Sequence, residues 1–99
     1  MSNDVELLRR YAKAGTEEAF TELVRRHVDF VYAAALRQTR NPHRAEDVTQ
    51  IVFTDLARKV ASLSYRDELV GWLHTSTRYA AIKVVRSEAR RAQREQGRR

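Results

Sequence analysis

The 99-residue sequence contains no cysteine, one proline and three glycines. Without cysteine the chain can form neither a disulfide nor a thiolate metal site, and this absence fits a reducing compartment. Alternating runs of β-branched residues, which are typical of strands, are also missing. Because 42% of the residues are hydrophobic and few form turns, the composition favours a helical domain with short connections.

Long apolar runs are absent as well. The run Val31–Leu36 is followed at once by Arg37 and is far shorter than the roughly 20 residues that a membrane helix needs. The N-terminus has no basic region followed by an apolar segment, which a signal peptide would show. We therefore expect no membrane partner and a cytoplasmic location.

Signatures of enzymes are missing too. The histidines His27, His43 and His74 share no metal-ligand spacing, and the sequence has no glycine-rich phosphate loop and no nucleophile elbow. The carboxylates stand singly beside arginines or at helix starts, where caps and ion pairs explain them. We expect no catalytic activity, no cofactor and no metal, and we interpret His27, which lies in an apolar stripe, as a packed imidazole.

The positive charge is concentrated at the end of the chain. The net charge is +6, and residues 71–99 hold eight Lys/Arg against two Asp/Glu, whereas residues 41–70 are slightly acidic. A slightly acidic middle followed by a strongly basic end indicates two different partners.

Hydrophobic periodicity predicts an all-α fold, a compact bundle of about four helices in which the last is long and basic. Gly15 is placed to end one helix, and Asn41 and Pro42 to cap and start another. We expect a single domain over residues 1–96 and a basic tail over 97–99. The predicted helices are Val5–Ala14, Glu17–Thr39, His43–Ala61 and Glu68–Gln96.

The third of these segments carries two patterned faces. From Val48 to Val60 every fourth residue is apolar, which predicts a stripe facing the core. The second face mixes a carboxylate, an amide, a hydroxyl, an apolar side chain and a guanidinium, which suggests a partner surface. The alternative is an ordinary surface helix with one stray isoleucine. The second face consists of Asp47, Gln50, Ile51, Thr54 and Arg58.

The last segment and the loop before it interleave basic residues with aromatic ones, a pattern typical of nucleic-acid binding. Trp72 also lies in phase with Leu69 and adjoins Leu73, so it has a competing interpretation as a core residue. After Val85 the apolar positions stop, and we expect the rest to protrude and fray. The interleaved aromatic residues are Tyr65, Trp72, His74 and Tyr79.

Two motifs resemble those of a known family. The run Ala45–Gln50 with Phe53 is similar to the "AED-hydrophobic-x-Q-x-x-F" signature of region 2 in extracytoplasmic-function (ECF) sigma factors of the sigma-70 superfamily. Gly71-Trp72-Leu73, followed by Arg86 and Arg90-Arg91, resembles the family's "WL…R…R" segment. The resemblance covers about residues 6–94.

This resemblance implies a helical domain that binds the β′ clamp helices of the RNA polymerase core and recognises and melts the −10 promoter element, holding its non-template strand. It also makes an anti-sigma factor a candidate partner. The implied polymerase contacts are Asp47, Gln50, Ile51, Phe53 and Thr54. The implied DNA contacts are Ser64, Tyr65, Arg66, Trp72, His74, Thr75, Arg78, Tyr79, Lys83, Arg86 and Arg90.

The sequence departs from the family pattern at three of these positions. Ile51 stands where the family usually has Glu, and Tyr79 and Lys83 stand where many members have Asn and Asp. The family also has a helix-turn-helix, region 4, and the basic end of this chain resembles the start of the linker to it. The competing hypothesis is a helical protein-interaction module, which predicts that the aromatic residues beside the basic face are buried.

Overall fold

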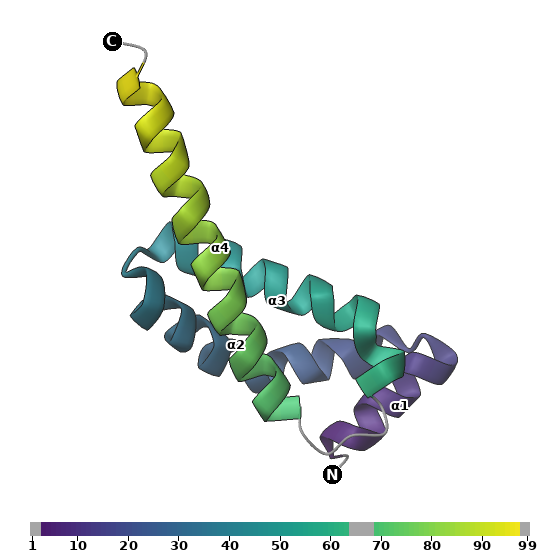
Figure 1. The fold of residues 1–99 in the computed structure, drawn as a ribbon. Coiled ribbons are helices and arrows are strands. Elements are labelled where there is room, and N and C mark those ends of the chain that lie inside the picture. Colours follow the sequence, from purple (N-terminus) through teal and green to yellow (C-terminus); the bar gives the residue numbers. More distant parts are fainter. Residues whose placement is uncertain (1–2, 64–68, 98–99) are drawn as a thin grey trace.

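The computed structural model describes residues 3–63 and 69–97, which form helices and no strand. Helices α2 and α3 pack along each other, α1 lies at one end of the pair, and α4 crosses them and projects beyond (Figure 1). The predicted all-α bundle is confirmed, while the loop residues Ser64, Tyr65 and Arg66 lie outside the described residues. The helices are α1 (Asp4–Ala14), α2 (Glu17–Thr39), α3 (Pro42–Leu63) and α4 (Leu69–Gly97).

Polar side chains and one glycine set the ends of α1. The Asn3 Oδ1 atom accepts a hydrogen bond from the Glu6 backbone N–H at 2.8 Å. Gly15 adopts a left-handed conformation with φ 62°, and its N–H donates to the Tyr11 carbonyl. Thr16 is the N-cap residue of α2, but its hydroxyl makes no capping bond. Its carbonyl instead accepts the Ala19 N–H at 3.1 Å.

The junction between α2 and α3 follows the predicted break. The Asn41 Oδ1 atom accepts a hydrogen bond from the Arg44 N–H at 3.1 Å, and Pro42 takes the first helical position. Helix α3 runs past Ala61 to Leu63, and α4 begins at Leu69. Both of these leucines are buried, so core contacts hold the helix ends at these positions.

The predicted stripe of α3 forms the centre of the core. Val48, Val52 and Leu56 are fully buried, and Val60 is nearly so. Helix α2 packs against α3, and its small residue Ala35 is buried in the same core cluster. The core is completed by leucines of the first two helices, including Leu7, Leu8 and Leu23.

Helix α4 divides into a packed half and a projecting half. Leu69, Leu73 and Ala80 are buried as expected, and Thr77 is buried in addition, with its hydroxyl donating to the Leu73 carbonyl at 2.6 Å. The end of α4 extends away from the bundle (Figure 1), which confirms the predicted protrusion. The helix continues to Gly97, one residue past its predicted end at Gln96.

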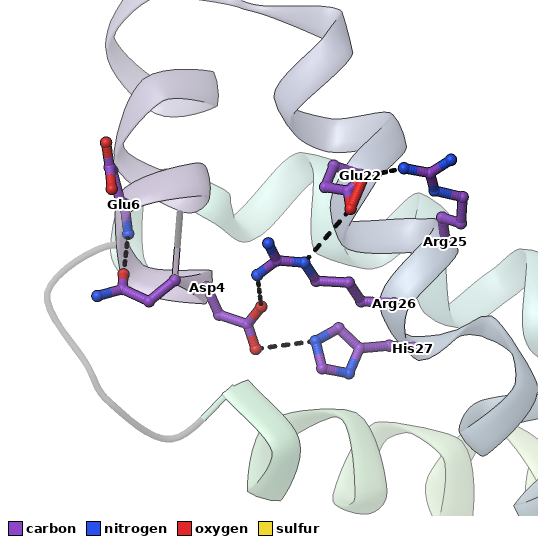
Figure 2. A network of polar contacts seen from close by, with 7 residues as sticks. Asp4, Glu6, Glu22, Arg25, Arg26 and His27 are labelled. Atoms are coloured by element: carbon purple, nitrogen blue, oxygen red, sulfur yellow. Dashed lines mark hydrogen bonds and ion pairs between the residues drawn. The ribbon is translucent and has the colours of Figure 1, made fainter. Parts of the chain in front are cut away.

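A polar network joins α1 to α2 (Figure 2). The Asp4 carboxylate contacts His27 Nε2 at 2.8 Å and Arg26 Nη1 at 3.3 Å. Arg26 and Arg25 also pair with Glu22, at 3.5 Å and 2.6 Å. His27 is partly buried at the core edge, as predicted, but its carboxylate partner comes from a different helix.

Candidate functional site

A groove of about 560 Å³ runs between α3 and α4. The five residues of the second face of α3 all line it, because they occupy successive turns of the helix beside the buried stripe. The sequence pattern did not predict the opposite wall, which comes from the distant helix α4. The lining residues are Asp47, Gln50, Ile51, Thr54, Asp55, Arg58, Val84, Ser87 and Glu88.

The groove is more acidic than the rest of this basic chain. Asp47, Asp55 and Glu88 contribute carboxylates, and Arg58 contributes the single guanidinium among the lining residues. Ile51, 39% exposed, adds an apolar surface. The stretch from Asp47 to Arg58 extends roughly 16 Å at 1.5 Å per residue. A partner helix with basic and apolar side chains matches this shape and charge.

Phe53, grouped with these residues by the family signature, lies elsewhere. It is 8% exposed and belongs to the hydrophobic core with Val52 and Leu56. The Phe53 ring lies on the side of α3 that the bundle covers, so core packing explains why the motif has an aromatic residue here. We therefore leave Phe53 out of the partner surface.

The outer surface of α4 presents cations and an aromatic ring together. Tyr79 is 66% exposed, and the other described residues of the predicted DNA-binding set are exposed around it, except Trp72. Trp72 is partly buried and packs against the core, in agreement with its competing interpretation. The exposed set is His74, Thr75, Arg78, Tyr79, Lys83, Arg86 and Arg90.

A smaller groove of about 280 Å³ lies on the other side of α4, against the end of α2. It is lined by Gln38, Ala81, Ile82, Val85 and Arg86. Ile82 and Val85 are exposed, and they were not singled out from the sequence. They add apolar surface to the basic face.

The remaining polar chemistry of the described residues is structural. No group of three or more His, Asp or Glu side chains lies together there as a metal site requires. A hydrogen bond from Arg25 holds the pKa of Glu22 below its ordinary value, but Glu22 is on α2 and lines neither groove described above. Within the same ranges, no helix has an apolar stretch long enough to cross a membrane.

Comparison with known proteins identifies the family of this chain. Residues 23–91, more than half of the chain, match the family model of Sigma-70 region 2. The chain belongs to this family. It is 39% identical over 72 residues to the ECF RNA polymerase sigma factor SigE of Mycolicibacterium smegmatis. That match covers 73% of this chain and 28% of SigE. No solved structure matches significantly.

In this sigma-70 region 2 domain the three departures from the family pattern are all on the surface. Ile51 lines the groove between α3 and α4, and Tyr79 and Lys83 lie on the outer surface of α4. The substituted positions are therefore available to partners and leave the core unchanged.

Proposed function

We propose that this domain directs transcription initiation by binding the β′ clamp helices of the RNA polymerase core in the groove between α3 and α4. One observation supports this proposal most directly. Four of the polymerase contacts that the family resemblance implies lie along the α3 wall of the groove. Asp47, Gln50, Ile51 and Thr54 all line the groove, where carboxylates outnumber the single guanidinium. This chemistry complements a helix that presents basic and apolar side chains.

The outer surface of α4 is the proposed site for the non-template strand of the −10 element. Arg78, Lys83 and Arg86 would hold phosphates, and the exposed Tyr79 ring would stack on an unpaired base, an interaction of about 1–3 kcal/mol. The exposure of His74 and Tyr79 favours this function over an interaction module without a DNA-reading role. The loop contacts Ser64, Tyr65 and Arg66 stay predictions. We place this activity in the cytoplasm, where polymerase and promoter meet.

An anti-sigma factor is a further proposed partner, derived from the family resemblance alone. A regulator that covered the groove would compete with polymerase, and one that covered the outer surface of α4 would compete with DNA. Both surfaces are open in this chain, which is what such competition requires.

The test compares Asp47→Ala and Gln50→Ala with Glu46→Ala. Glu46 is an exposed carboxylate beside Asp47 that does not line the groove, so it controls for charge. Each groove variant should weaken binding to core polymerase and to an isolated clamp-helix fragment by about tenfold, the effect of roughly 1.4 kcal/mol. Glu46→Ala should bind like the wild type.

Fluorescence titration measures the affinities, and circular dichroism shows whether each variant is folded. Unchanged affinity in both groove variants, with the fold intact, would contradict the assignment of this groove to polymerase.

A further inference from the structure

We infer that α4 supplies one wall of the polymerase-binding surface, so that the clamp helix contacts Val84, Ser87 and Glu88 as well as α3. This inference rests on the proposed function, and it extends the contact beyond the α3 signature on which that function is based. The three residues form the wall of the groove opposite the Asp47–Arg58 face.

The spacing of the α4 wall suits a helical partner. Val84, Ser87 and Glu88 are three and four residues apart, so they share one side of α4 and point into the same groove. Val84 is partly buried against the core, and Ile51 is exposed on the opposite wall. A helix seated between them buries both apolar side chains together, which neither wall alone achieves.

Glu88 and the two aspartates of the groove indicate the chemistry of that helix. Its carboxylate is 3.8 Å from Arg44 Nη2 on α3 and 3.7 Å from Arg91 Nη1 on α4. Both separations exceed the 2.7–2.9 Å of a strong charge-assisted hydrogen bond, so the carboxylate retains capacity for a further donor. Arg44 and Arg91 offset the charge of Glu88, so the occupant is a helix that presents basic side chains to Asp47 and Asp55 and a hydrogen-bond donor to Glu88.

The two proposed binding surfaces of α4 then adjoin each other along the helix. Arg86 is on the exposed surface proposed for DNA, while the next residue, Ser87, lines the groove proposed for polymerase. A partner held by Ser87 and Glu88 would thereby fix the direction in which the basic end of α4 points.

The decisive comparison is Ser87→Arg against Ala89→Arg. Both positions are exposed on α4 and both variants add one positive charge, but only residue 87 lines the groove. We expect Ser87→Arg to weaken binding to core RNA polymerase from Mycolicibacterium smegmatis by at least about tenfold, because the new side chain fills the groove and repels a basic partner. Ala89→Arg should leave the affinity within about twofold of wild type.

A second pair separates a contact role for Glu88 from an indirect one. Glu88→Gln removes the carboxylate charge, whereas Arg44→Gln removes its ion-pair partner on α3 and keeps the charge. Direct contact predicts a larger loss of polymerase affinity for Glu88→Gln. Equal losses would overturn the direct contact of Glu88.

The outcome also distinguishes this inference from the function on which it rests. If Asp47→Ala weakens polymerase binding and Ser87→Arg does not, the α4 wall is wrong and the α3 contact stands. If folded variants of both walls bind as the wild type does, the assignment of the groove to polymerase fails, and this inference fails with it.

Discussion

Helices α3 and α4 are both amphipathic, yet the bundle holds them differently. The buried residues of α3 extend from Ala45 to Leu63, almost its full length, whereas those of α4 end at Ala81, about halfway along. Helix α3 therefore has one free face for a partner, while the second half of α4 is exposed nearly all round. Substitutions in the stripe of α3 should change stability, and those at the end of α4 should change binding.

The largest expected effect tests the stability half of this comparison. Leu56→Ala and Ile51→Ala remove the same number of carbon atoms from one helix, but Leu56 is fully buried and Ile51 is 39% exposed. Leu56→Ala should lower the free energy of unfolding by about 2–5 kcal/mol because it leaves a cavity. Ile51→Ala should lower it by less than about 1 kcal/mol.

Urea unfolding followed by circular dichroism measures both values. Ile51→Ala also has a functional readout. This variant should stay folded and should bind core polymerase more weakly than the wild type. Similar losses of stability in the two variants would mean that Ile51 is part of the core and that the free face of α3 is narrower than described.

The difference between α3 and α4 also explains which features could be predicted from the sequence. The stripe from Val48 to Val60 repeats regularly within one helix, so periodicity alone identified it. The sequence pattern grouped Phe53 with the partner surface because a family signature records which residue types recur and does not separate core residues from contacts. Burial of Phe53 became evident only from the packing of α3 in the bundle.

Contacts between different helices could not be predicted from the sequence pattern. Ser87 and Glu88 face Asp47 only because of the way α4 crosses α3, and Asp4 meets His27 across 23 positions. Neither the crossing nor the docking of α1 is encoded in a local spacing. The last helix was predicted to end at Gln96 and ends at Gly97, although no apolar stripe marks this part of the chain.

The next largest expected effect tests whether the exposed end of α4 binds DNA. Changing Arg90, Arg91 and Arg94 together to Gln should weaken binding to single-stranded DNA and reduce the slope of log affinity against log salt by about 2, given a contribution of roughly 0.7 per phosphate contact. The free energy of unfolding should change by less than about 0.5 kcal/mol, because all three side chains are exposed.

Fluorescence anisotropy over a range of salt concentrations measures this slope. The matched control changes Arg9, Arg10 and Lys13 to Gln, which removes the same charge from exposed positions on α1. An equal change of slope in the control would show that DNA responds to the net charge of the chain and that the end of α4 has no special role.

The smallest expected effect concerns the Glu22 carboxylate of α2, which lies on neither α3 nor α4. The hydrogen bond from Arg25, aided by the charges of Arg25 and Arg26, places the pKa of Glu22 below its ordinary value of 4.5. A group whose pKa is lowered by folding stabilises the protein above the unfolded-state pKa, and this stabilisation is lost as the pH falls through the folded-state value. Glu22→Gln should therefore be slightly less stable than the wild type at pH 7 and equal to it in acid. Solvent screening keeps this difference small.

Urea unfolding midpoints of the two proteins, measured from pH 7 to pH 3, test whether their stabilities become equal in acid. A gap that widened in acid would contradict this sign. A small gap at pH 7 that closes in acid would show that this ion pair adds little beside the buried stripe of α3.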